Sequence, residues 1–350
     1  MNRKRASILV DASNSGGGSN ILAQYLNDKL VEFGHSCFFV VPKQFTKELN
    51  RSYQINSFGP FDPRRQAAIE KLATQYKPDS ILSFGNIPLR KRFPNCRHLT
   101  FFHNAYLLPG LAPKAIPLRV RLRILAIQLS IKFLKVNTDT WIVQTNFVKG
   151  RLAKWLRLED GKVVVAPFFR PPQFSIDAQN INHKLDLFYP SNFSYHKNHC
   201  NLIRAISWCQ DHNQRFTLGL TLGEVADPSF QSALNSAISN GADIRLLGTI
   251  SHDQVFSVMR ESKAVVFPSV LETLGLGLVE AATLKKPVVA SNTNWIDEIV
   301  STDYKFDPSS PESIGRTIIR CLSEEEQKPA IRRIEDKIDV VCDLLSGYAC

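Results

Sequence analysis

The chain has 350 residues, enough for two domains of ordinary size, and its 44% hydrophobic and 21% charged residues exclude a disordered chain, a collagen and a coiled coil. Its 43 basic and 32 acidic side chains give a net charge of +11. No uncharged apolar run reaches the roughly 18 residues of a membrane-spanning helix, and no signal peptide is recognised. Seven dispersed cysteines without a CxxC pair favour reduced thiols, and hence a cytoplasmic protein, over disulfides or a zinc site.

Strand and helix patterns alternate through the first half of the chain. A buried strand is expected at 7–13, three glycines follow at 16–18, and a helix is expected from Ile21 to about Gly34. Further strands are expected at 37–41, 80–84, 99–103, 140–144 and 162–167. Such β-loop-α-β units predict a parallel sheet with right-handed crossovers.

The second half repeats this alternation, with a helix expected at 201–210 and an amphipathic helical pattern at 323–347. Its strands are expected at 185–191, 215–222, 243–248, 264–269 and 287–291. We therefore predict an α/β protein with two doubly wound, Rossmann-like parallel-sheet domains facing a cleft. The predicted divisions are a first domain at 1–170, a linker at 171–183, a second domain at 184–325 and a C-terminal segment at 326–350.

The positive charge is concentrated between Ser80 and Thr138, where no Asp or Glu occurs. The basic residues there are Arg90, Lys91, Arg92, Arg97, Lys114, Arg119, Arg121, Arg123, Lys132 and Lys135. Residues 117–136 are predicted to form one helix with a narrow polar stripe along an otherwise apolar surface. This stripe comprises Arg121, Gln128, Lys132 and Lys135.

Three interpretations of the basic stretch are open. The helix could be a core element whose basic side chains reach solvent. Residues 90–135 could instead make peripheral contact with an anionic membrane, on the inner face of the cell membrane, or receive an anionic acceptor. No binding motif supports the third interpretation, a nucleic-acid surface, and we expect no nucleic-acid partner.

The most informative motif is FPSVLETLGLGLVEAATLKKPVVAS at 267–291. A helix is expected to begin near Thr273–Gly275, where its free N–H groups and dipole favour a phosphate. Glu272 precedes this helix, and Glu280 lies roughly 8 Å along it with its side chain leaning back toward the same end. Two carboxylates beside a phosphate-binding turn suit a nucleotide sugar. Taken alone, two glutamates would more simply be a charge near the helix N-cap and an exposed helix residue.

Glu272 and Glu280 match the E-x7-E motif of retaining glycosyltransferases of the GT-B fold, and their surroundings resemble glycosyltransferase family 4 (group 1). KPVVAS, WIDEIV and FDPSSPESI follow in the family's order. The resemblance implies transfer of a sugar from a nucleotide-sugar donor to a saccharide or lipid-linked acceptor, in cell-surface polysaccharide or lipopolysaccharide assembly. It also implies that the first domain binds the acceptor, that the second binds the donor, and that the C-terminal helix packs on the first.

The resemblance assigns donor-binding roles to matching residues. Glu280 would accept hydrogen bonds from the ribose, and Glu272 would bind hydroxyls of the donor sugar. The diphosphate and sugar would be held by backbone N–H groups. These belong to Thr273, Leu274, Gly275 and Leu276, with Gly17 and Gly18 approaching from the first domain.

Two further residues complete the implied catalytic centre. His103, at a strand end, would contact the donor sugar, and Lys197 would neutralise the diphosphate. The family's arginine is replaced by Asn192, so stabilisation of the leaving group would rest on Lys197 and the helix N-terminus. Because no D-x-D motif occurs, we expect transfer without a metal ion, and we expect no cofactor.

Two other nucleotide-binding activities lack their motifs in this sequence. The sequence GGGSN at 16–20 lacks the G-x-G-x-x-G spacing of a nicotinamide dehydrogenase, and no P-loop motif of a nucleotidase occurs. A nucleotide-sugar epimerase of the same fold stays an alternative. So does a catalytically silent GT-B protein that binds sugar or membrane, which the replacement at Asn192 favours.

Overall fold

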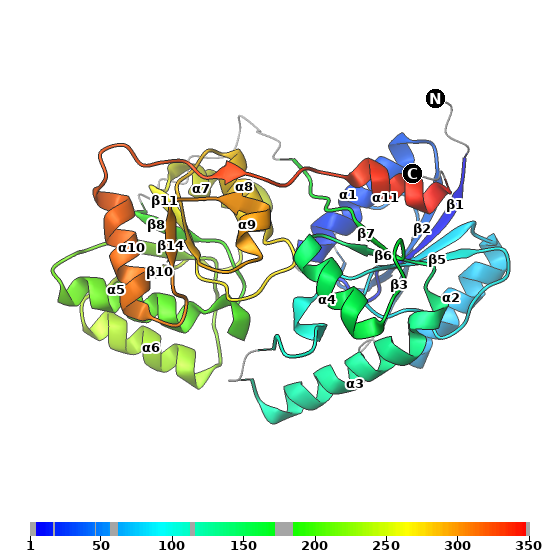
Figure 1. Cartoon of the computed structure of the whole chain (residues 1–350), viewed down its shortest axis with the longest axis horizontal. Coiled ribbons are helices and arrows are strands. Elements are labelled where there is room, and N and C mark those ends of the chain that lie inside the picture. Colours follow the sequence, from blue (N-terminus) through cyan, green and yellow to red (C-terminus); the bar gives the residue numbers. More distant parts are fainter. Residues whose placement is uncertain are drawn as a thin grey trace. The chain divides into compact units, whose positions relative to one another are not determined.

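The computed structural model describes residues 5–16, 18–45, 47–56, 62–112, 116–171 and 185–347, which form two compact units (Figure 1). The first unit comprises the described residues of Met1–Ala112, Ile116–Arg170 and Glu335–Cys350. The second comprises those of Pro171–Ile334. Each unit is built around one parallel sheet.

The first unit contains a seven-stranded sheet in the order β3-β2-β1-β4-β5-β6-β7 among its described residues, with every pair parallel. The strands are β1 Ser7–Asp11, β2 Ser36–Pro42, β3 Ser52–Ile55, β4 Ser80–Ser83, β5 Arg97–Phe101, β6 Thr140–Val143 and β7 Val163–Val165. Its α-helices are α1 Gly18–Glu32, α2 Pro63–Tyr76, α3 Leu118–Leu134, α4 Asn146–Leu156 and α11 Ile338–Ser346. Two 3-10 turns, η1 Ala105–Leu107 and η2 Lys135–Asn137, flank α3.

The second unit contains a six-stranded parallel sheet in the order β10-β9-β8-β11-β12-β14. Its strands are β8 Leu187–Tyr189, β9 Thr217–Leu220, β10 Asp243–Leu246, β11 Ala264–Phe267, β12 Val288–Ser291 and β14 Tyr304–Phe306. Its helices are α5 His199–Asp211, α6 Pro228–Ser239, α7 His252–Glu261, α8 Leu276–Thr283, α9 Ile296–Ile299 and α10 Pro311–Ser323, with a 3-10 turn η3 at Tyr195–Lys197. The short strands β13 Val300–Ser301 and β15 Ile331–Arg332 pair antiparallel.

Continuous apolar runs explain the central strands of both sheets. Residues 264–267 read AVVF and are all buried, as are residues 187–189 in the adjacent strand β8. Helices cover both faces of a parallel sheet, so its strands carry apolar side chains on both faces. The prediction of an α/β chain with two parallel sheets is confirmed.

The helix predicted over 323–347 is wrong for its first part. The chain leaves α10 at Ser323, and the next helix, α11, begins only at Ile338. Pro329 disfavours helical geometry at the residue before it, and the N–H of Ala330 donates to the carbonyl of Lys286. Strand β15 then pairs with β13 through backbone hydrogen bonds. The amphipathic spacing in this part of the chain therefore belongs to an extended segment of the second unit.

Helix α11 packs within the first unit, against α1, β1 and β4. The Ser80 hydroxyl donates to the carbonyl of Leu345 at 2.7 Å, and the Arg97 guanidinium donates to the carbonyls of Leu344 and Leu345 at 2.8 and 3.0 Å. These bonds satisfy carbonyls at the helix C-terminus, which have no partner within a helix. The last turn of α11 is thereby attached to two neighbouring strands of the first sheet.

Helix α3 forms where predicted but is not a core helix. Among its residues only Ile131 is buried, and the helix runs along the outside of the first unit (Figure 1). Gln128 and Lys135, expected on a solvent-facing stripe, instead donate to the carbonyls of Leu107 and Leu156. Apolar spacing alone does not show which face of a helix is covered. None of the helices among the described residues is long and apolar enough to cross a membrane.

Candidate functional site

The second unit places two loops side by side at the carboxyl edge of its sheet. One loop follows β8 and contains residues 190–198, and the other follows β11 and contains residues 268–275. Strands β8 and β11 are parallel neighbours, so their carboxyl ends lie at the same edge. This edge is where doubly wound sheets bind ligands.

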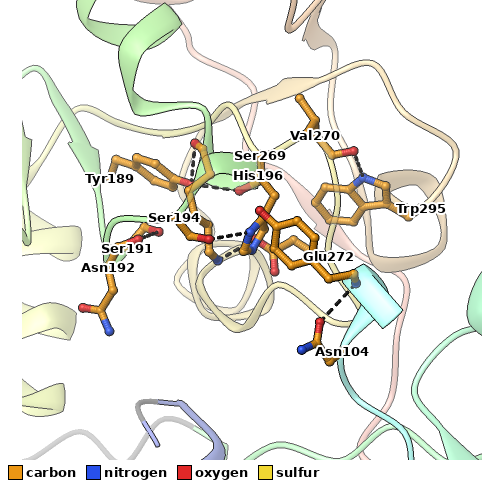
Figure 2. Close-up of polar contacts among 12 residues, drawn as sticks. Asn104, Tyr189, Ser191, Asn192, Ser194, His196, Ser269, Val270, Glu272 and Trp295 are labelled. Carbon is orange, nitrogen blue, oxygen red and sulfur yellow. Dashed lines mark hydrogen bonds and ion pairs between the residues drawn. The ribbon is translucent and has the colours of Figure 1, made fainter. Parts of the chain in front are cut away.

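Buried polar contacts hold the two loops together (Figure 2). The N–H of Val270 donates to the carbonyl of His196 at 2.8 Å. The Tyr189 hydroxyl lies 2.8 Å from the Ser269 hydroxyl and donates to the Lys197 carbonyl at 3.1 Å. Burial raises the pKa of Tyr189, which keeps this hydroxyl protonated and able to donate. Lys197 and Glu272 therefore rest on loops whose backbones are fixed to each other.

Lys197 and Glu272 form an ion pair in this frame. The Lys197 Nζ lies 2.5 Å from Glu272 Oε1, and the two side chains are 21% and 11% exposed. His196 Nε2 lies 3.9 Å from the same oxygen, and its Nδ1 is 2.9 Å from the Ser194 hydroxyl (Figure 2). Burial lowers the pKa of His196 to about 4. His196 is therefore neutral at neutral pH, and Lys197 supplies the positive charge beside Glu272.

Glu280 lies in helix α8 and is paired with a histidine from another element. Gly275 has a left-handed φ of +62° and ends the loop, so α8 begins at Leu276 and Glu280 is its fifth residue. The Glu280 side chain is 11% exposed, and its Oε1 lies 2.7 Å from His252 Nε2. His252 is the first residue of α7, where Ser251 and Gln254 form a capping box. Sequence reasoning missed His252, because nothing in the local pattern links it to Glu280.

The turn at 273–276 offers the N-terminal end of α8. The first N–H groups of a helix have no acceptor within it, and no acidic residue occupies the first turn of α8. Leu274 is buried, and Trp295 Nε1 donates to the carbonyl of Val270 at 3.3 Å (Figure 2). The buried Leu274 side chain anchors the turn in the protein, and Thr273 and Leu276 are more accessible than Leu274.

Tight packing inside the second unit explains the glycine at position 277. A Cβ at this position would lie 3.2 Å from a Phe267 ring atom and 3.3 Å from Pro190. The glycine lets α8 pack closely on the end of β11 and on the loop after β8.

Asn192 does not join the cluster around Glu272. It is exposed, and Figure 2 shows its amide directed away from Glu272 and His196. The neighbouring Ser191 hydroxyl donates to the Asn192 backbone carbonyl at 3.1 Å. The position that carries an arginine in the resembling family thus contributes no charge here and no contact to the Lys197–Glu272 pair.

The first unit carries the other predicted residues. Gly17 lies outside the described residues. Gly18 is the exposed first residue of α1, and Ser19 closes the preceding turn through hydrogen bonds of 2.8 Å with the Gly16 backbone. His103 follows β5, and its ring stacks on that of Phe101 with centroids 4.9 Å apart. The backbone N–H of His103 donates to Asn86 Oδ1 at 2.7 Å. Burial lowers the pKa of His103 to about 4, so the ring is neutral and suited to hydroxyl hydrogen bonds.

A buried ion pair supports the loop between β1 and α1. Arg65 and Asp11 are 5% and 1% exposed, and their side chains meet at 2.5 Å. Asp11, at the end of β1, also accepts hydrogen bonds from the N–H and the hydroxyl of Ser13, at 3.3 and 2.7 Å. The sequence showed an acid at a strand end but not that an arginine 54 residues away would be buried against it.

Buried histidines predict a pH-dependent stability. Burial lowers the pKa of His103 and His196 to about 4 and that of His199 to about 3. An unfolded histidine titrates near 6.5, so below this pH the unfolded chain binds protons that the folded chain does not. Stability is therefore lost as the pH falls from about 6.5 toward 4, by about 2 kcal/mol per histidine at pH 5. Thermal unfolding between pH 8 and pH 5 measures this loss.

The matched variants for this experiment are His199→Phe and His212→Gln. His199 packs between the rings of Tyr189 and Phe193, whereas His212 is exposed. We expect His199→Phe to remove about one third of the pH dependence and His212→Gln to leave it unchanged. Equal slopes in the wild type and in His199→Phe would contradict the role given to burial.

The described residues contain no cluster of candidate metal ligands. No group of three or more His, Cys, Asp or Glu side chains is placed to hold a metal ion in this part of the chain. Transfer without a metal stays a prediction, since a metal can also be held by substrate phosphates.

Known proteins resemble the chain in sequence and fold. Residues 173–336 match the family model of glycosyl transferases group 1. An uncharacterized glycosyltransferase, MJ1178, of Methanocaldococcus jannaschii is 31% identical over 96 residues. That match spans 27% of this chain and only 27% of the length of the relative.

Solved structures share the fold of the whole chain. WaaG, a glycosyltransferase involved in lipopolysaccharide biosynthesis, superposes with a TM-score of 0.71 at 13% identity, covering 97% of this chain and 100% of WaaG. Anabaena Alr3699/HepE in complex with UDP-glucose gives a TM-score of 0.68 at 15% identity, covering 97% of this chain and 95% of HepE. The predicted GT-B fold is confirmed by these neighbours.

Proposed function

We propose that this chain, whose residues 173–336 match the family model of glycosyl transferases group 1, transfers a sugar from a nucleotide-sugar donor to a glycan or lipid-linked acceptor. The donor would bind at the carboxyl edge of the second sheet, where Lys197, Glu272 and Glu280 lie around the N-terminus of α8. The acceptor would be recognised by the first unit, which carries His103.

The observation that carries this proposal is the Lys197–Glu272 pair, 2.5 Å long and fixed on two loops that hydrogen-bond to each other. A cation and a carboxylate held together beside a helix N-terminus can bind different parts of a nucleotide sugar. The cation and the N–H groups suit the diphosphate, and the carboxylate suits the sugar hydroxyls. In this arrangement the donor phosphate must compete with Glu272 for Lys197.

The proposed reaction breaks the bond between the anomeric carbon and the phosphate oxygen, and the nucleoside diphosphate keeps the electron pair. Lys197 and the N-terminus of α8 would stabilise the charge that develops on it. The acceptor hydroxyl would form its bond to the anomeric carbon on the face that the phosphate leaves, so configuration is retained. Its proton would pass to an oxygen of the leaving phosphate, which needs neither a protein base nor a metal ion.

The biological setting is proposed from the acceptor class. A saccharide carried on a lipid would place the enzyme in cell-surface polysaccharide or lipopolysaccharide assembly, at the cytoplasmic side of the membrane. The involvement of WaaG in lipopolysaccharide biosynthesis supports this class, and the binding of UDP-glucose by HepE supports a nucleotide-sugar donor.

Nucleotide binding tests the proposed donor site. We expect one of UDP, GDP, dTDP and ADP to raise the melting temperature of the wild type, because a ligand at 100 times its Kd adds about 2.7 kcal/mol. Glu280→Ala should lose this shift, since the ribose would lose its acceptor. Glu312→Ala is the matched control, because Glu312 is an exposed glutamate of α10. The shifts are measured with and without magnesium.

The opposite result would favour a catalytically silent protein. The exposed Asn192, which adds no charge to the site, is the observation that favours a catalytically silent protein. If none of the four nucleotides shifts the melting temperature, with or without magnesium, the donor site does not function as proposed.

A further inference from the structure

The outer face of α3 and η2 carries six apolar side chains that the fold leaves in water. They are Leu118, Leu122, Leu125, Leu129, Phe133 and Val136, here called the outer stripe, with exposed fractions between 53% and 76%. At 100° per residue they fall within roughly 80° of the helix circumference. A contiguous exposed apolar stripe of this size marks an interaction surface.

The opposite face of the helix fixes its orientation. Ile131 is buried, and Ile124, Ile127 and Leu134 pack against the core cluster that contains Trp141 and Leu152. The hydrogen bonds of Gln128 and Lys135 to the carbonyls of Leu107 and Leu156 hold the same face down. The outer stripe is therefore held outward by packing and is not a frayed segment.

Basic side chains border the outer stripe on both sides. By helical position Arg121 and Lys132 lie along one border, and Arg119 and Arg123 lie along the other. All four are exposed. The exposed Arg90 and Lys91 adjoin the end of the stripe, since Asn137 donates to the carbonyls of Leu89 and Arg90 at 2.8 and 3.1 Å.

Charge decides between the two occupants that an apolar helix face can have. A second copy of this chain would bring the same basic borders together, and no Asp or Glu between Ser80 and Thr138 could offset them. An anionic lipid surface offers an apolar interior for the stripe and negative head groups for its borders.

We propose that α3 lies in the plane of an anionic membrane, with the outer stripe inserted among the acyl chains and the basic borders at the head groups. This proposal extends the membrane location given under the proposed function. Only its biological role depends on that function. Vesicle binding itself needs neither donor nor acceptor, so its failure is distinguishable from failure of the donor site.

The test is flotation of the full chain with vesicles of phosphatidylcholine alone or with roughly one third phosphatidylglycerol. We expect at least about tenfold stronger binding to the anionic vesicles, weakened but not abolished by salt. Leu122→Gln/Leu125→Gln/Leu129→Gln should lower binding by about tenfold or more. Ile238→Gln, which removes a 51% exposed isoleucine from the second unit, should leave binding unchanged.

A second pair of variants separates local charge from net charge. Arg119→Gln/Arg123→Gln/Lys132→Gln should weaken binding to anionic vesicles by about tenfold or more. Arg204→Gln/Arg260→Gln/Arg316→Gln makes the same change in net charge at exposed positions of the second unit and should bind as the wild type. Circular dichroism and the melting temperature without ligand verify that each variant is folded.

Three outcomes would overturn the proposal. The wild type could fail to bind either kind of vesicle, or the triple leucine variant could bind as strongly as the wild type. The third is a concentration-dependent dimer, seen by analytical ultracentrifugation without vesicle binding and abolished by the leucine variant. That result would assign the outer stripe to a second copy of the chain.

Discussion

Replacing Lys197 by alanine is expected to lower kcat by about 10²- to 10³-fold, the usual cost of removing one preorganised group from developing negative charge. Asn192 supplies no charge and points away from Glu272, so the loss would not be shared with an arginine at that position. The measurement is the hydrolysis or transfer rate with the donor whose nucleotide stabilises the wild type.

Companion variants distinguish leaving-group stabilisation from simple loss of structure. Lys197→Arg keeps the charge and should recover part of kcat. Lys263→Ala removes a surface cation that pairs with Asp186 in the same unit, and it should leave kcat unchanged. A Lys197→Ala enzyme with normal kcat and a raised KM would show instead that Lys197 binds donor equally in the ground and transition states.

Replacing Arg65 by methionine is expected to destabilise the first unit by about 3–5 kcal/mol, because it leaves Asp11 buried without its cation. Asp11 is 1% exposed, and its remaining hydrogen-bond donors come from Ser13. Local opening of β1 and α2 measures this effect directly, through hydrogen exchange of peptides that cover Ser7–Asp11 and Pro63–Tyr76.

The adjacent residue on the same helix provides the control. Arg64 also pairs with an aspartate, Asp62, but the Arg64 side chain is 53% exposed. Arg64→Met should therefore leave hydrogen exchange close to that of the wild type. The double variant Arg65→Met/Asp11→Asn removes the buried charge while keeping an acceptor for Ser13, and it should recover much of the lost protection. Equal protection in Arg64→Met and Arg65→Met would contradict this account.

The parallel strands were predictable because burial on both faces leaves a continuous apolar run. SILVD at 7–11 and AVVF at 264–267 are read in this way directly from the sequence. Strand β3, with the sequence SYQI, was missed because three of its four residues are exposed and it has no such run. The orientation of α3 was missed for a related reason: an apolar pattern on two faces of a helix does not say which face has a partner.

From local pattern alone, the candidate site was predictable only where its residues are close in sequence, and Lys197 was assigned to it only by the family resemblance. Glu272, the turn at 273–276 and Glu280 form one continuous motif, and helical geometry relates them. The Lys197–Glu272 pair joins residues 75 positions apart, and His252 and Glu280 are 28 apart on different helices. Such contacts depend on strand order and helix packing, which local periodicity does not encode.

The location of α11 bears on how the chain is made. The first unit needs residues 335–347, and Ser80 and Arg97 hold the last carbonyls of α11. During synthesis the β-strands of this unit leave the ribosome first, while α11 is translated only after the entire second unit. The surface of α1, β1 and β4 that α11 covers therefore stays open until residues 338–346 have been translated. A nascent chain of this protein has to keep an unfinished first domain from aggregating while it builds the second.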